Sequence, residues 1–65
     1  MQTRMAMRLK KLRETRGLTQ EALAHKTKLS LGFVARLEQG RHDPSLSSLQ
    51  KIAKALRCKV AELVE

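Results

Sequence analysis

The sequence predicts an all-α fold, a compact bundle of five short helices. Apolar residues recur every three or four positions along the chain, as they do on one face of a helix, and no segment alternates as a strand does. Thr, Ser and Gly residues suited to starting and ending helices stand between these segments. With 65 residues the chain has room for one domain, predicted to be residues 1–65.

The first two helices are predicted on either side of Gly17. Glycine readily adopts the left-handed conformation that ends a helix, so the first helix is expected to end there. Thr19 is placed to cap the second helix, and Glu21 lies in its first turn, where the helix dipole favours an acid. The inward faces of these two helices are predicted to hold Met5, Leu9, Leu12, Ala22 and Leu23.

Three more helices are predicted in the second half of the chain. Ser30 caps the third, which ends at Gly40, and Ser45 caps the fourth after a loop at residues 41–44. The inward faces are predicted to hold Val34 and Leu37 in the third helix and Leu46, Leu49, Ile52, Ala53 and Leu56 in the fourth. A short fifth helix is predicted to carry Val60 and Leu63, and to extend as far as Val64.

The charge of the chain indicates a negatively charged partner. Its net charge is +8, from 14 Lys and Arg against 6 Asp and Glu. Two short helices joined by a tight turn, over about residues 19–40, are a shape that fits a DNA major groove. Together these features predict double-stranded DNA as the partner. The alternative is a basic surface that only keeps the protein soluble.

The sequence disfavours catalytic and metal-dependent functions. His25, His42 and Cys58 lack the spacing of metal ligands, and Asp43 is the only Asp and stands in a predicted loop. We therefore expect no enzyme activity, no cofactor and no metal site. The lone cysteine and the absence of a signal-peptide pattern favour the cytoplasm. No stretch approaches the roughly 20 apolar residues that span a membrane.

Three blocks of sequence resemble the Cro/C1-type helix-turn-helix family, also called the XRE family. The blocks are L-x-x-L-R-x-x-x-G-L-T-Q-E-x-L-A over residues 9–24, S-x-x-F-V-x-R-L-E-x-G over residues 30–40 and P-S-L-x-x-L-x-K-I-A-K-A-L over residues 44–56. The resemblance implies a lambda-repressor-like domain that binds operator DNA as a homodimer. The chain departs from the family pattern at Leu31 and Gly32, where polar residues are usual, and at Arg57, where glycine is common.

The outer face of the third helix carries the candidate base-contacting residues Leu31, Gly32 and Arg36. The fork of Arg36 matches O6 and N7 of guanine, although this arginine could instead contact a phosphate or solvent. Leu31 offers an apolar contact to a thymine methyl, or packs against the second helix. Gly32 allows close approach of the backbone, or is neutral.

Candidate phosphate contacts flank that face. Gln20 begins the second helix, where free backbone amides and the helix dipole favour an anion, and the family resemblance supports this role. Ser30 is first a helix cap and second a phosphate contact. Gln39, Arg41 and His42 follow the third helix and either hold the flanking backbone or form a solvated loop.

Arg13 and Glu38 are predicted to form a structural ion pair. Each lies four residues after an apolar residue of its helix, at the edge of the buried face, and needs a partner there. The family resemblance places an Arg–Glu pair at these positions as well. The pair would join the first helix to the third.

The C-terminal segment is the predicted homodimer interface, through Val60, Leu63 and Val64. Residues 59–65 are apolar and slightly acidic, which suits contact with protein. The predicted function is a transcriptional regulator on an inverted-repeat operator, such as a restriction–modification controller or a small phage-type repressor. The alternative is an antitoxin that binds a protein toxin and regulates its own operon. A toxin or RNA polymerase is thus a possible protein partner.

Overall fold

Residues 3–65 of the computed structural model form five helices and, within that range, no strand. The helices are α1 (Arg4–Thr15), α2 (Gln20–Thr27), α3 (Leu31–Glu38), α4 (Leu46–Leu56) and α5 (Val60–Val64). The predicted all-α class and the order of the five helices are confirmed.

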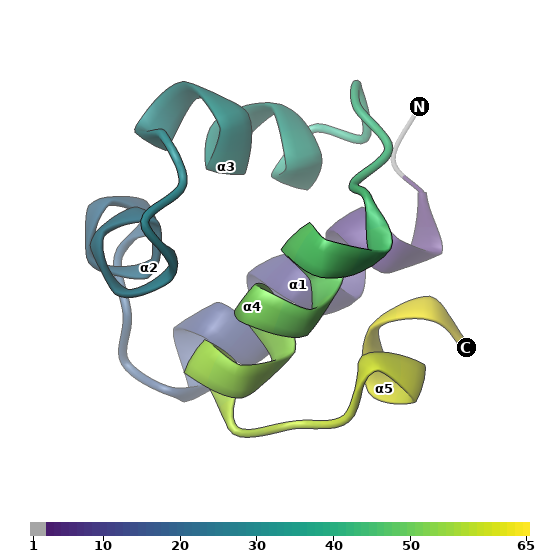
Figure 1. The fold of residues 1–65 in the computed structure, drawn as a ribbon. Helices are drawn as coiled ribbons and strands as arrows, with labels where there is room; N and C mark the ends of the chain where they lie inside the picture. The colour runs from purple at the N-terminus through teal and green to yellow at the C-terminus, as the bar shows by residue number, and fades with distance from the viewer. Residues whose placement is uncertain (1–2) are drawn as a thin grey trace.

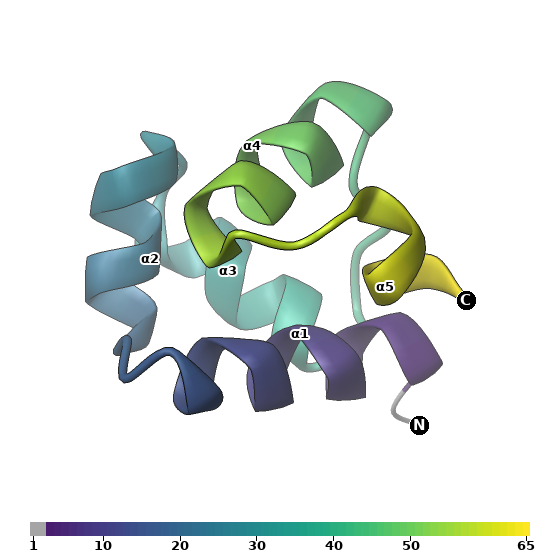
Figure 2. The ribbon, with the colours of Figure 1, turned by 90° about the horizontal axis from the view of Figure 1, so that it is seen from below.

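The helices surround one aliphatic core. α2 packs against both α3 and α4, whereas α1 packs against α3 and α5. α1 lies behind α4 in Figure 1, and the turned view in Figure 2 separates the two. All five helices contribute to this core. Its largest fully buried side chains are Leu9, Leu23, Val34, Leu37, Ile52, Leu56 and Leu63.

Hydroxyl side chains cap the first four helices. Each hydroxyl accepts a hydrogen bond of 3.0–3.1 Å from the backbone N–H three residues later, which satisfies an amide that has no partner inside the helix. The caps predicted at Thr19, Ser30 and Ser45 are confirmed. Thr3 caps α1 in the same way and was not predicted from the sequence.

Four residues end helices in the left-handed region, and only two of them are glycines. Gly17 and Gly40 have φ near +72° and +71°, as their predicted role requires. Lys28 and Arg57, the C-caps of α2 and α4, have φ of +61° and +56°. A Cβ in this region crowds the following carbonyl oxygen, so both residues carry backbone strain.

The prediction that Leu46 faces the core is wrong. Leu46 is the first residue of α4 and its exposed fraction is 64%. The buried residues of α4 all lie in its later turns, at Ile52, Ala53 and Leu56, so the first turn extends beyond the packed region. Ala6, in contrast, was not predicted and is fully buried, because its small side chain lets α1 approach its neighbours closely.

None of the helices formed by residues 3–65 combines the length and apolar character that crossing a membrane requires.

Candidate nucleic-acid interface

One side of α3 is fixed to the core and the other is open to solvent. Val34 and Leu37 are fully buried. Gly32 and Arg36 lie on the exposed side, and Leu31 at the start of the helix is 45% exposed. The three candidate base-contacting residues therefore share one accessible face, as the helical spacing predicts.

Gly32 leaves the space in which the guanidinium of Arg36 rests. A Cβ built at Gly32 would lie 3.4 Å from Nη1 of Arg36. This contact is with the far end of a flexible side chain, so a larger residue at position 32 would displace the guanidinium rather than the backbone. Gly32 therefore lets the side chain of Arg36, the only Arg or Lys of α3, lie close to the helix surface.

A buried hydrogen-bond network holds the inner side of α3. Arg13 donates from Nε to Oε2 of Glu38 at 2.6 Å and from Nη2 to Oε1 at 3.1 Å. Its remaining nitrogen Nη1 donates to the carbonyl oxygen of Leu18 at 2.7 Å. Gln20 donates from Nε2 to Oε1 of Glu38 at 3.1 Å. The network brings together the pair that the sequence predicts and joins α1, the start of α2 and the end of α3.

The ion pair in this network is desolvated and geometrically complete. The exposed fractions of the two side chains are 10% for Arg13 and 4% for Glu38. The hydrogen bonds that Arg13 donates to Glu38 raise the pKa of Arg13, although burial opposes the shift. Because both charges are buried, either one would be left without compensation if the other were removed.

The bond between Gln20 and Glu38 was not predicted from the sequence. The two residues are 18 positions apart, and no local pattern signals a bond over that separation. Gln20 still lies at the first position of α2 and is partly exposed. One amide hydrogen is used by Glu38, which leaves the other hydrogen and the carbonyl oxygen for a further contact.

The loop after α3 is ordered by contacts back to that helix. The backbone N–H of Arg41 donates to the carbonyl oxygen of Arg36 at 3.0 Å. The ring of His42 packs edge-on against Phe33, with a centroid separation of 5.0 Å and an interplanar angle of 73°. His42 therefore has a fixed position although it is exposed. No pattern in the sequence predicted the contact between these two rings.

The candidate phosphate-contacting residues lie around the two ends of α3. Ser30 precedes the helix, and Gln39, Arg41 and His42 follow it, all four of them exposed. Gln20 is attached to the last residue of α3 through its bond to Glu38. This arrangement would frame a duplex lying against the outer face of α3.

The predicted dimer residues do not share one surface. Leu63 is fully buried in the core of its own chain, so its predicted place in the interface is corrected. Val64 is 49% exposed and Val60 is partly buried. α5 is short, and Leu63 is its one buried residue, whereas Val60 packs at the edge of the core and Val64 lies outside it.

No group of three potential metal ligands occurs among residues 3–65. Burial raises the pKa of the Cys58 thiol, with Glu62 adding to the effect, which keeps this partly buried sulfur neutral. A neutral thiol is a poor nucleophile and a poor ligand.

The chain matches the family model described as helix-turn-helix, HTH_3, over residues 9–63. It is 42% identical over 60 residues to the immunity repressor protein of Bacillus phage phi105, an alignment that covers 92% of this chain and 42% of that protein. It is 36% identical over 62 residues to the HTH-type transcriptional regulator DdrOP3 of Deinococcus deserti, covering 95% of this chain and 48% of that protein. The chain thus spans less than half the length of these two relatives.

Solved structures share the fold. The restriction-modification controller protein C.AhdI from Aeromonas hydrophila superposes with a TM-score of 0.89 at 37% identity, covering 92% of this chain and 91% of that one. SinR in complex with DNA superposes with a TM-score of 0.91, covering 94% of this chain and 98% of that one. Its identity is 24%, so it supports the fold alone.

Proposed function

The chain belongs to the helix-turn-helix family HTH_3, and from this premise we propose that it is a transcriptional regulator that binds a specific duplex site through the outer face of α3. The observation that carries the proposal is the position of Arg36. It is exposed on a helix whose opposite side is held by the Arg13–Glu38 pair, and Gly32 leaves room for its guanidinium. An exposed arginine on a helix that is held in this way suits bidentate recognition of guanine.

We propose that the regulator acts as a homodimer on an inverted repeat. Val64 of α5 and Leu46 at the start of α4 are 49% and 64% exposed. α5 and the start of α4 lie on the same side of the molecule in both views (Figures 1 and 2). Pairing two copies through this side would cover apolar surface and present two α3 helices. Their spacing on DNA would be about 34 Å, one helical turn.

The relatives favour a repressor or controller role. The chain is similar to a phage immunity repressor and to a restriction-modification controller protein. Such a protein binds a site near a promoter and changes access of RNA polymerase to it, which makes RNA polymerase a possible partner. The chain spans less than half the length of the two curated relatives, so we propose this role for it on similarity over that shared part alone.

Selection of bound duplexes from a random pool tests the proposal. We expect an inverted repeat whose half-sites are centred about one helical turn apart. An enriched sequence without two-fold symmetry would contradict the dimer, and an unselected pool would contradict specific binding altogether.

Sedimentation tests the dimer surface. Val64→Glu should shift the protein toward the monomer, both free and on the selected DNA, because it places a charge in the paired surface. Met7→Glu is the matched control, since Met7 is also exposed, at 59%, but lies on α1. Equal effects of the two variants, or a monomer on DNA in the unaltered protein, would contradict this interface.

The antitoxin alternative is tested by purification from the native host. Co-purification of a stoichiometric protein partner that becomes toxic when it is released from this chain would support the antitoxin function. Recovery of the regulator as a homodimer alone would support the regulator.

A further inference from the structure

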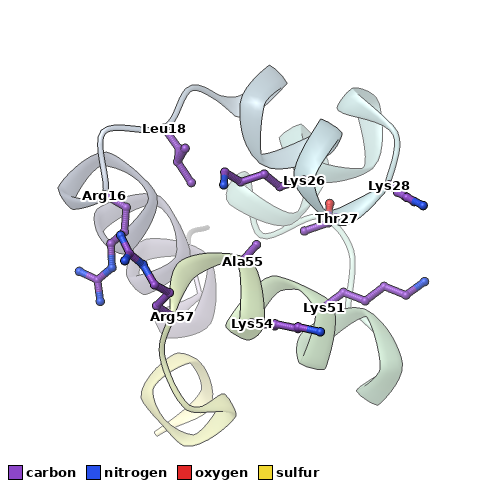
Figure 3. Close-up of a pocket in the computed structure, with 9 residues that line it drawn as sticks. All are labelled: Arg16, Leu18, Lys26, Thr27, Lys28, Lys51, Lys54, Ala55 and Arg57. Atoms are coloured by element: carbon purple, nitrogen blue, oxygen red, sulfur yellow. The ribbon is translucent and has the colours of Figure 1, made fainter.

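An open hollow of about 800 Å³ lies where α1, α2 and α4 end. Figure 3 shows it with Arg16 and Arg57 toward one end, Lys28 and Lys51 toward the other, and Leu18 and Ala55 between them. α3 contributes no residue to it. In Figure 2, α3 lies behind the segment that joins α4 to α5. The residues that line the hollow are Arg16, Leu18, Lys26, Thr27, Lys28, Lys51, Lys54, Ala55 and Arg57.

Six of these nine residues are cations and none is an acid. They are a large share of the 14 Lys and Arg in the chain. The outer face of α3 and the loop after it, in contrast, carry only Arg36 and Arg41. Most of the positive charge is therefore placed away from the proposed DNA-binding face.

Helix ends account for part of this charge but not for all of it. Arg16, Lys28 and Arg57 are the C-caps of α1, α2 and α4, where a cation offsets the negative end of the helix dipole. Each helix end contributes about half a negative charge, so three of them offset about 1.5 of the six positive charges. Arg16 also donates from Nε to the carbonyl oxygen of Leu56 at 2.8 Å. Within residues 3–65 the ion pairs are formed by Arg13, so none of the six cations in the hollow has an acidic partner there.

We propose that the hollow binds a compact oligophosphate, a free chain of three or more phosphate groups. Such a ligand carries about four negative charges, close to the positive charge of the hollow that the helix ends do not offset. Its volume also fits the hollow. Arginine forks and lysine ammonium groups are the side chains that bind phosphate oxygens. The floor of Leu18 and Ala55 holds no aromatic ring on which a base could stack. The phosphate chain alone is therefore the recognised part, and a nucleoside attached to it adds little.

The proposed site is independent of the DNA-binding proposal. Its residues come from α2 and α4 and from the segments that follow α1, α2 and α4, and α3 is not involved. A ligand in the hollow leaves the outer face of α3 accessible. The oligophosphate and the duplex are thus expected to bind at the same time.

Titration calorimetry with inorganic triphosphate tests the site in the full chain. Lys51→Gln together with Lys54→Gln should weaken binding about tenfold, since each removed charge costs part of a decade. Lys10→Gln together with Lys11→Gln is the matched control, because it removes the same charge from α1 outside the hollow. We expect the control to retain the affinity of the unaltered protein within about twofold. ATP should bind within about threefold of triphosphate, since the base has no stacking partner.

Three results would overturn the proposal. Equal losses in the two double variants would mean that triphosphate senses only the net charge. A loss on Arg36→Ala as large as that on the Lys51 and Lys54 changes would place the ligand on the α3 face. Binding of nonspecific duplex DNA through the hollow, with no binding of triphosphate, would make it a second nucleic-acid contact. Circular dichroism of each variant separates loss of the site from loss of folding.

Discussion

Arg36 and Arg41 lie close along the chain, but in the proposed complex they would face different parts of a duplex. Arg36 projects from the outer face of α3 beside Gly32, whereas Arg41 follows the helix in the loop that His42 and Phe33 hold in place. A side chain on the outer face of a recognition helix can reach base edges, and one in the loop after the helix reaches the DNA backbone. The two arginines should therefore separate specificity from general affinity.

Replacing Arg36 with Ala should cost about 1–3 kcal/mol of binding free energy and relax the preference at one base pair per half-site. Arg41→Ala should weaken all sequences equally and reduce the salt slope by about one per subunit. Gln20→Ala should also weaken all sequences, with little change in slope because Gln is uncharged. Binding of each variant to a panel of single-base changes in the selected site provides the measurement. Full discrimination retained by Arg36→Ala would place another residue in the groove.

Glu38→Ala should destabilise the protein by about 3–5 kcal/mol, because it leaves the buried Arg13 without its counter-charge. Domains have only about 5–15 kcal/mol of stability in total, so this variant should lose a large part of it. Glu14→Ala is the control. Glu14 is also paired with Arg13, at 4.0 Å, but is 59% exposed, so its loss should cost under about 1 kcal/mol. Urea denaturation measures the free energy of unfolding of both variants. Similar losses of stability in the two would show that burial does not set the strength of the ion pair.

At the scale of the helices, the ends of α2 and α4 are strained. Arg57 adopts a left-handed conformation that glycine adopts without penalty. Arg57→Gly should therefore stabilise the protein by about 0.5–1 kcal/mol, after the greater flexibility of glycine in the unfolded chain is taken into account. Thermal unfolding in a buffer without phosphate tests this, since Arg57 also lines the hollow.

Gly17→Ala supplies the opposite control. A Cβ at Gly17 would meet no atom within 4 Å, and φ there is +72°. Its cost, about 1 kcal/mol, would thus come from the backbone conformation alone. A stabilising Gly17→Ala, or a destabilising Arg57→Gly, would show that this conformation is not strained.

The existence and order of the helices could be predicted because their signals are local. Caps at Thr19, Ser30 and Ser45 act within one turn, and the spacing of Val34 and Leu37 identifies the buried side of α3. Where each helix meets its neighbours is not a local property. The sequence therefore placed Leu46 in the core, although no other helix covers the first turn of α4.

The same limit applies to the candidate site. The outer face of α3 and the partners Arg13 and Glu38 could be predicted, since each residue lies at a definite angle on its helix. The bond from Gln20 to Glu38, the packing of Phe33 on His42 and the gathering of six cations at three helix ends depend on how distant segments meet. No pattern in the sequence marks them.

At the scale of the whole molecule, the uneven charge makes a quantitative prediction for salt. If a dimer meets DNA only through the face that carries Arg36 and Arg41, it brings four cations to the duplex and neutralises at most about four phosphates, so the slope of log K against log salt is no steeper than about −3.6. Affinity should then fall by about two decades between 50 and 200 mM salt. Contacts from the hollow as well would bring the slope to about −14. A titration of the selected site over this range distinguishes the two, and a flat response would contradict both.

The carboxylate of Glu38 accepts hydrogen bonds from α1 and from α2 at once, so α3 cannot turn about its own axis while the domain stays folded. In the proposed function, α3 would therefore reach DNA with its orientation already set. Association then costs little conformational entropy in the protein, and a mismatched base cannot be accommodated by tilting the helix. The rigidity that lowers the cost of binding the correct site also makes errors in the site more costly.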